Sequence, residues 1–204
     1  MNQHVRPPAP DHPSARPTTR AAEGLQRWRW TTAELIRLTD LGAFRAEDKF
    51  ELIGGEIVPM SPTGRWHEVL VEDLERALRD LETASERVVK EPQFNLDDDT
   101  YTEPDILVRP AHILTPDVRG DTALLVVEVA DSSLDFDLTT KAAQYCSFGV
   151  REYWVVNVKT RETTVHRSPE PAGYADVVKL RKRTTLRPSL APHLAVRLAD
   201  LDRK

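Results

Sequence analysis

The amino-acid sequence predicts an α/β fold in which a mixed β-sheet is flanked by helices, and three segments carry this prediction. Residues 123–130 form an almost unbroken apolar run, which is typical of a strand buried on both faces. A helical pattern over 137–148 and a second apolar strand over 152–158 follow, so this unit should join parallel strands by a right-handed crossover. Residues 66–81 place leucines at helical spacing, which predicts an amphipathic helix.

Residues 28–204 are expected to form one folded domain behind a disordered tail at 1–27. Five of the fifteen prolines lie in the first seventeen residues, where no apolar periodicity is present. A capping box from Thr31 to Glu34 should open a short helix over 33–39.

The remaining elements give the order helix, three strands, helix, strand after an N-terminal helix and hairpin. Gly54-Gly55 indicates a two-residue hairpin between short strands at 50–53 and 56–60. The helix at 66–81 is followed by expected strands at 87–95, 105–109 and 123–130, a turn at 97–99, the helix at 137–148 ended by Gly149, and a hairpin of 152–158 with 163–167. The rest of the chain is weakly patterned.

The composition excludes several classes of protein. Cys146 is the only cysteine, so an intramolecular disulfide and a cysteine-based zinc site are both excluded, and Cys146 is expected in the core. No segment approaches the ~20 apolar residues of a membrane span, and the N-terminus lacks a signal-peptide core, so we expect a cytoplasmic protein without a membrane partner. A glycine-rich phosphate loop, a nucleophile elbow and a dinucleotide fingerprint are all missing from the sequence.

Two acidic residues stand at unusual positions in the predicted sheet. Glu128 interrupts the apolar run at 123–130, and a carboxylate in a central strand is costly to bury without a compensating partner. Asp105 opens a strand directly after Pro104. Together they could hold one hard divalent cation, because Mg²⁺ prefers oxygen ligands and keeps several waters. The simpler alternatives are a Glu128 that meets solvent or an arginine at the strand end, and an Asp105 that only caps a turn.

Lys141 and His67 are the candidate partners of these carboxylates. Lys141 lies one helical turn after Asp137 and one turn before Tyr145, so the three share a helix face. A lysine there could stabilise charge on a phosphate, whereas an exposed Asp137–Lys141 pair is the alternative. His67 opens the helix at 66–81, where it could bind phosphate or transfer a proton, or serve only in capping or packing.

These residues belong to a longer, ordered set of short sequence blocks. The blocks are 50–57, 60–62, His67, 103–105, 127–129, 132–133, Asp137 with Lys141 and Tyr145, 149–150 and 152–155. Taken together, between about residues 28 and 180, they resemble the Uma-type restriction endonuclease family of the PD-(D/E)XK nuclease superfamily.

The resemblance implies a restriction-endonuclease-like core whose metal ligands are Asp105 and Glu128. The third position of the (D/E)XK block is Ala130 in this chain, a departure that transfers the lysine's role to the following helix and to Lys141. Glu51 and His67 match further blocks of the family, which makes them candidate catalytic residues as well.

The implied activity is that of an Mg²⁺- or Mn²⁺-dependent endonuclease that hydrolyses phosphodiester bonds in nucleic acid, DNA above all. A homodimer would match the two strands of a duplex. The net charge of −5 is unfavourable for binding phosphates, although local basic patches matter more than the total. Two alternatives stay open on the same fold: a catalytically silent nucleic-acid-binding or interaction module, and a phosphohydrolase acting on small substrates.

Overall fold

The computed structural model describes residues 27–45, 48–60 and 64–201, so the tail predicted at 1–27 lies outside the described residues except for Arg27. A main sheet of six strands has the order β10-β9-β8-β7-β6-β3. Its strands are β3 (Glu86–Lys90), β6 (Ile106–Pro110), β7 (Leu125–Ala130), β8 (Glu152–Asn157), β9 (Thr163–Glu170) and β10 (Gly173–Leu180). β7 and β8 are parallel and the other neighbours are antiparallel, which confirms the predicted mixed sheet and its crossover.

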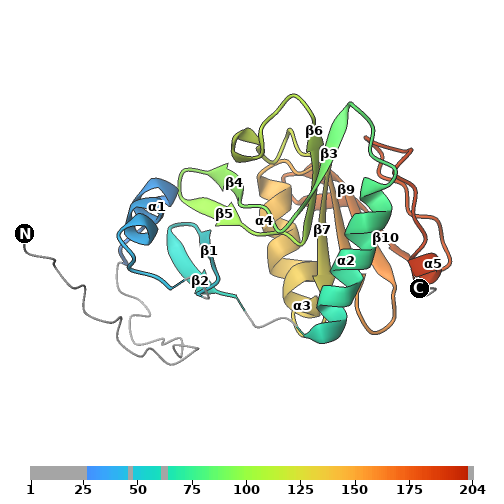
Figure 1. Ribbon diagram of the computed structural model, residues 1–204, viewed down its shortest axis with the longest axis horizontal. Coiled ribbons are helices and arrows are strands. Elements are labelled where there is room, and N and C mark those ends of the chain that lie inside the picture. Colours follow the sequence, from blue (N-terminus) through green and yellow to red (C-terminus); the bar gives the residue numbers. More distant parts are fainter. Residues whose placement is uncertain (1–26, 46–47, 61–63, 202–204) are drawn as a thin grey trace, which may run out of the picture.

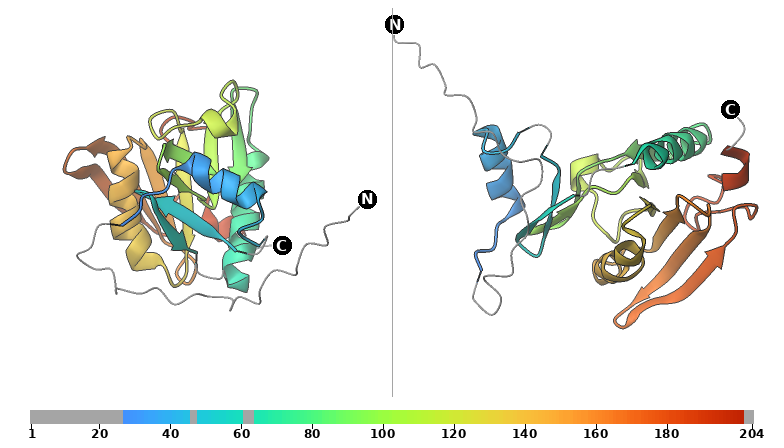
Figure 2. Two further views of the ribbon diagram at one scale, coloured as in Figure 1. Left: turned by 90° about the vertical axis from the view of Figure 1, so that its left-hand side faces the viewer. Right: turned by 90° about the horizontal axis from the view of Figure 1, so that it is seen from below.

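Helices cover both faces of the main sheet (Figures 1 and 2). On one face lie α2 (Arg65–Arg79) and the short α5 (Leu198–Leu201), and on the other lie α3 (Leu134–Phe136), a π-helical turn (Asp137–Lys141) and α4 (Ala142–Ser147). Strand alternation divides β7 between two hydrophobic clusters, because Val127 and Val129 pack toward α2 whereas Val126 and Ala130 pack toward α4. Glu128 therefore belongs to the α4 face.

A second sheet, of four strands in the order β2-β1-β5-β4, lies beside the main one (Figure 1). It consists of β1 (Phe50–Ile53), β2 (Glu56–Pro59), β4 (Phe94–Asp97) and β5 (Thr100–Thr102), and α1 (Thr32–Asp40) packs against it. The predicted capping box is confirmed, since the Thr31 hydroxyl accepts from the Glu34 amide while the Glu34 carboxylate accepts from the Thr31 amide. The predicted hairpin at Gly54-Gly55 is confirmed as well.

The prediction of one strand over 87–95 is wrong, because this segment contributes one strand to each sheet. Glu91 adopts a positive φ of 45° and the following residue is Pro92, which has no amide hydrogen to donate. The chain therefore leaves the main sheet after β3 and enters the second sheet at β4. The short β5 and the edge strand β10 were not expected from the pattern. With the β4–β5 hairpin set aside, the main-sheet order is the predicted αβββαβ.

The helix predicted at 137–148 begins earlier, at Leu134, and contains the π-helical turn. A π-helical turn changes the direction of the side chains on either side of it and is frequent at functional sites. Gly149 adopts φ 75° immediately after the helix, as the expected C′ residue. No helix among the described residues is long and apolar enough to cross a membrane.

Candidate active site

Glu128 lies on the α4 face of β7 and is almost completely buried, with 6% of its surface exposed. Tyr145, one turn into α4, donates its hydroxyl to Glu128 Oε1 at 3.1 Å, and the same hydroxyl lies 3.0 Å from Thr102 Oγ1. Burial raises the pKa of Glu128 well above its usual range, and Lys141 opposes this shift. The alternative of a solvent-exposed Glu128 at a strand end is therefore wrong.

Lys141 reaches Glu128 from the π-helical turn and connects the two sheets. Its Nζ lies 2.9 Å from Glu128 Oε1 and 3.0 Å from Glu51 Oε1. Glu51 stands on β1 of the second sheet, where the Glu103 amide also donates to its Oε1 at 3.1 Å. Although burial alone would lower the pKa of Lys141, the carboxylates of Glu128 and Glu51 raise it well above its usual range. Lys141 is consequently a buried ammonium, and the alternative of an exposed Asp137–Lys141 pair is wrong.

Asp105 and His67 form a second contact pair next to this one. Asp105 precedes β6, and its Oδ2 accepts from the amide of Val129 on β7 at 2.6 Å. His67, in the first turn of α2, places Nε2 3.2 Å from Asp105 Oδ1. Burial lowers the pKa of His67, but the hydrogen bond and charge of Asp105 outweigh it, so the net shift is upward. Asp105 thus does more than cap a turn.

The charges of the buried groups do not balance. Glu51, Asp105, Glu128 and Asp137 are all at least nine-tenths buried, and Lys141 is the only buried lysine among the described residues. Burial raises the pKa of Asp137, while a 2.6 Å hydrogen bond from the Ser133 hydroxyl opposes the shift. Several buried carboxylates around one ammonium are costly unless a further cation or bound protons compensate.

The structure brings the five predicted residues into one region. Lys141 contacts both Glu51 and Glu128, and His67 pairs with Asp105 next to them. No hydrogen bond joins the Asp105 and Glu128 carboxylates directly, although the charge of Asp105 contributes to the raised pKa of Glu128. Among the described residues, no three His, Cys, Asp or Glu side chains are grouped so that they could hold a metal ion. A cation in this region would have at most two such side chains as ligands and would need water or substrate oxygens for the remainder, an arrangement that Mg²⁺ accepts.

Sequence reasoning missed the hydroxyl relay that runs from Thr102 through Tyr145 to Glu128. Tyr145 carried a usable signal, since it follows Lys141 by one helical turn and shares its face. Thr102 carried none, because a threonine in a three-residue strand is an ordinary strand residue.

Glu103, in the same block as Asp105, is half-buried, and burial raises the pKa of its carboxyl.

Comparison with known proteins agrees with this architecture. No curated protein matches the sequence. A crystal structure from Anabaena variabilis, described as "a putative nuclease belonging to DUF820", is similar in fold, with a TM-score of 0.66 at 16% sequence identity over 84% of this chain and 96% of that one. The Uma2 family, described as "Putative restriction endonuclease", matches residues 32–199. Since that match spans most of the sequence, the chain belongs to the Uma2 family of restriction-endonuclease-like proteins.

Proposed function

We propose that this protein is a metal-dependent endonuclease that hydrolyses phosphodiester bonds in DNA. The observation that carries the proposal is the buried excess of carboxylates around Lys141, at the junction of the two sheets. A divalent cation and an anionic phosphate would together complete the charges of such a site. The family description and the name given to the Anabaena protein support a nuclease.

Asp105 and Glu128 are the residues that would hold Mg²⁺ or Mn²⁺. A divalent cation bound there would polarise a phosphoryl oxygen and supply a nucleophile from water at neutral pH. Asp105 directly precedes β6 and Glu128 lies on β7, the strand paired with β6, while the Val129 amide orients Asp105. This rigid placement is what a site needs in order to position a small hard cation.

Lys141, Glu51 and His67 would act on the phosphate and its protons. The Lys141 ammonium would stabilise negative charge that develops on the phosphate, and Glu51 holds the lysine in place from the second sheet. His67 lies against Asp105 and can hold or transfer a proton at Nε2. A homodimer would place two such sites on the two strands of a duplex.

The test is nicking of supercoiled plasmid in Mg²⁺ or Mn²⁺, with and without EDTA. The near-isosteric variants Asp105→Asn, Glu128→Gln and Lys141→Met should lose nicking while keeping a native circular dichroism spectrum. Glu86→Gln is the matched control, because Glu86 is equally buried but binds Thr83 and His193 in another part of the molecule. This control should cut as the wild type does.

Two results would replace the proposal. A wild type that binds DNA but cuts neither DNA nor RNA with either metal would be a binding module. A wild type that hydrolyses bis(p-nitrophenyl) phosphate but leaves DNA and RNA intact would be a small-substrate phosphohydrolase.

A further inference from the structure

We infer that one edge of the main sheet is the surface along which duplex DNA lies, an inference that rests on the proposed function. This surface, the basic edge, consists of Arg65, Lys159, Arg181 and Arg183. All four side chains are exposed.

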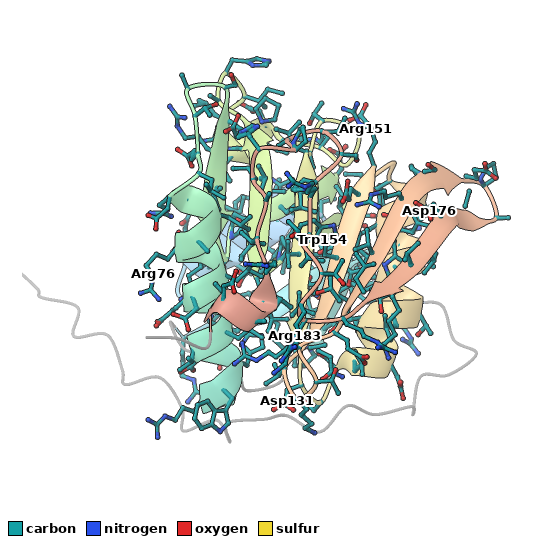
Figure 3. The ribbon with its side chains drawn as sticks, turned by 90° about the vertical axis from the view of Figure 1, so that its right-hand side faces the viewer. Arg76, Asp131, Arg151, Trp154, Asp176 and Arg183 are labelled. Atoms are coloured by element: carbon teal, nitrogen blue, oxygen red, sulfur yellow. The ribbon has the colours of Figure 1, made fainter. Side chains whose placement is uncertain are left out.

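The strand pairings bring the members of the basic edge to the same end of the sheet. Ala130 at the end of β7 pairs with Asn157 at the end of β8, so Lys159 follows at that end. Thr163, which opens β9, pairs with both Val156 and Leu180, so Arg181 follows there too. Figure 3 shows Arg183 and Asp131 at this end, beside the start of α2.

Asp131 connects the start of α2 with the β8–β9 turn. Its Oδ1 lies 3.3 Å from Lys159 Nζ. Its Oδ2 lies close to Gly64, because a Cβ atom added to that glycine would be 3.5 Å from it. Gly64 is the N-cap of α2 and its neighbour is Arg65. Arg65 and Lys159 therefore flank Asp131, at the same end of the sheet as Arg181.

The basic edge gathers four basic side chains at one end of the sheet even though the whole chain carries −5, and the acidic side chains beside them are Asp131 and Glu162. Lys159 pairs with Asp131, whereas Arg183 forms no ion pair within the described part of the chain. Arg65 packs over the ring of Trp66, with its Cζ 5.6 Å from the ring centroid, and Trp66 is 64% exposed.

The distance between the basic edge and the candidate active site suits a duplex. Asp131 follows Glu128 by three residues on an extended strand, which is about 10 Å at a rise of ~3.3 Å per residue. His67 follows Arg65 by two residues on α2. One strand of B-DNA carries a phosphate about every 3.4 Å along the axis. A duplex with its scissile bond at Glu128 would thus bring that strand to the basic edge about three phosphates away from the scissile bond.

Two triple variants of the full chain separate this surface from a general effect of charge. Lys159→Gln, Arg181→Gln and Arg183→Gln remove three charges from the basic edge. Arg76→Gln, Arg79→Gln and Arg151→Gln remove three charges from exposed residues away from that end, two of which Figure 3 labels. Binding of a fluorescein-labelled 24-base-pair duplex is followed by anisotropy between 50 and 200 mM KCl, in EDTA and in Ca²⁺.

The basic-edge variant should lower the slope of log affinity against log salt by about three, because each lost phosphate contact removes about 0.9. The control variant should keep the wild-type slope. In plasmid nicking, the basic-edge variant should raise KM and leave kcat at saturating DNA unchanged.

Equal slopes in the two variants would overturn the inference while leaving nicking, and so the proposed function, intact. Wild type that binds through the basic edge but never cuts would overturn the proposed function alone. A third outcome is that the wild type binds phosphatidylserine vesicles but not DNA, and that the basic-edge variant loses the vesicle binding. This result would make the basic edge a membrane-binding surface instead.

Discussion

Replacing Lys141 by methionine tests whether the buried charges are arranged as the structure indicates. The ammonium lies within 3.0 Å of both Glu51 and Glu128, and no more than 8% of any of the three side chains is exposed. Breaking a buried pair by removing one partner costs about 3–5 kcal/mol, against about 0–1 kcal/mol for an exposed pair. We therefore expect Lys141→Met to lower the free energy of unfolding by about 3–5 kcal/mol at pH 8. A typical domain has a free energy of unfolding of ~5–15 kcal/mol, so the loss would be a large part of the total.

The loss should depend on pH, with a definite sign. Lys141 is the largest influence that lowers the pKa of Glu128 against the effect of burial, so without it this pKa rises further above its ordinary value of 4.5. The folded variant then holds a proton that the unfolded chain releases above about pH 4.5. Its stability should therefore rise as the pH falls from 8 toward 4.5, by up to about 1.4 kcal/mol per pH unit.

Urea denaturation followed by tryptophan fluorescence from pH 5 to 8.5 measures this dependence. The double variant Lys141→Met, Glu128→Gln is the control, because the amide that replaces the Glu128 carboxylate cannot ionise, and it should recover stability at pH 8 and lose the added slope. A free energy of unfolding for Lys141→Met within about 1 kcal/mol of the wild type at pH 8, the range of an exposed pair, would show that Lys141 is not part of a buried ion pair. Equal pH slopes in the single and double variants would show that Glu128 is not the group that takes up the proton.

Three further outcomes are expected. Tyr145→Phe removes the hydroxyl between Thr102 and Glu128. It should lower the free energy of unfolding, measured by urea denaturation, by about 1–3 kcal/mol and should reduce nicking. An unchanged free energy of unfolding would show that these hydrogen bonds do not stabilise the protein. Burial lowers the pKa of His166, so its contribution to stability is present above pH 6.5 and is lost as the pH falls through the lowered value. The variant His166→Phe should therefore lose less stability in acid than the wild type does. Equal stability profiles of the two proteins in acid would contradict this expectation. Mn²⁺ at about 100 times its Kd should stabilise the wild type by about 2.7 kcal/mol in thermal melts but leave Asp105→Asn unchanged, and equal shifts would place the ion elsewhere.

Several features of the fold follow from local sequence alone. The capping box at Thr31, the glycine turn at Gly54-Gly55 and the leucine spacing of α2 each depend on a few neighbouring residues, and the structure contains all three. Alternation along β7 likewise places Glu128 with Val126 and Ala130 before any partner is known. Backbone geometry within one turn or one strand is sufficient for such predictions.

The meeting of distant residues is a different matter. Glu51 is separated from Lys141 by ninety positions and reaches it from another sheet, and that division of sheets arises where the chain turns at Glu91 and Pro92. The spacing of apolar residues also does not predict the π-helical turn that contains Lys141. The sequence by itself determined which elements form and which carboxylates are unusual, because these depend on local geometry and hydrophobicity. Only the tertiary structure decided which charges are buried together, because that depends on how separate sheets and helices pack.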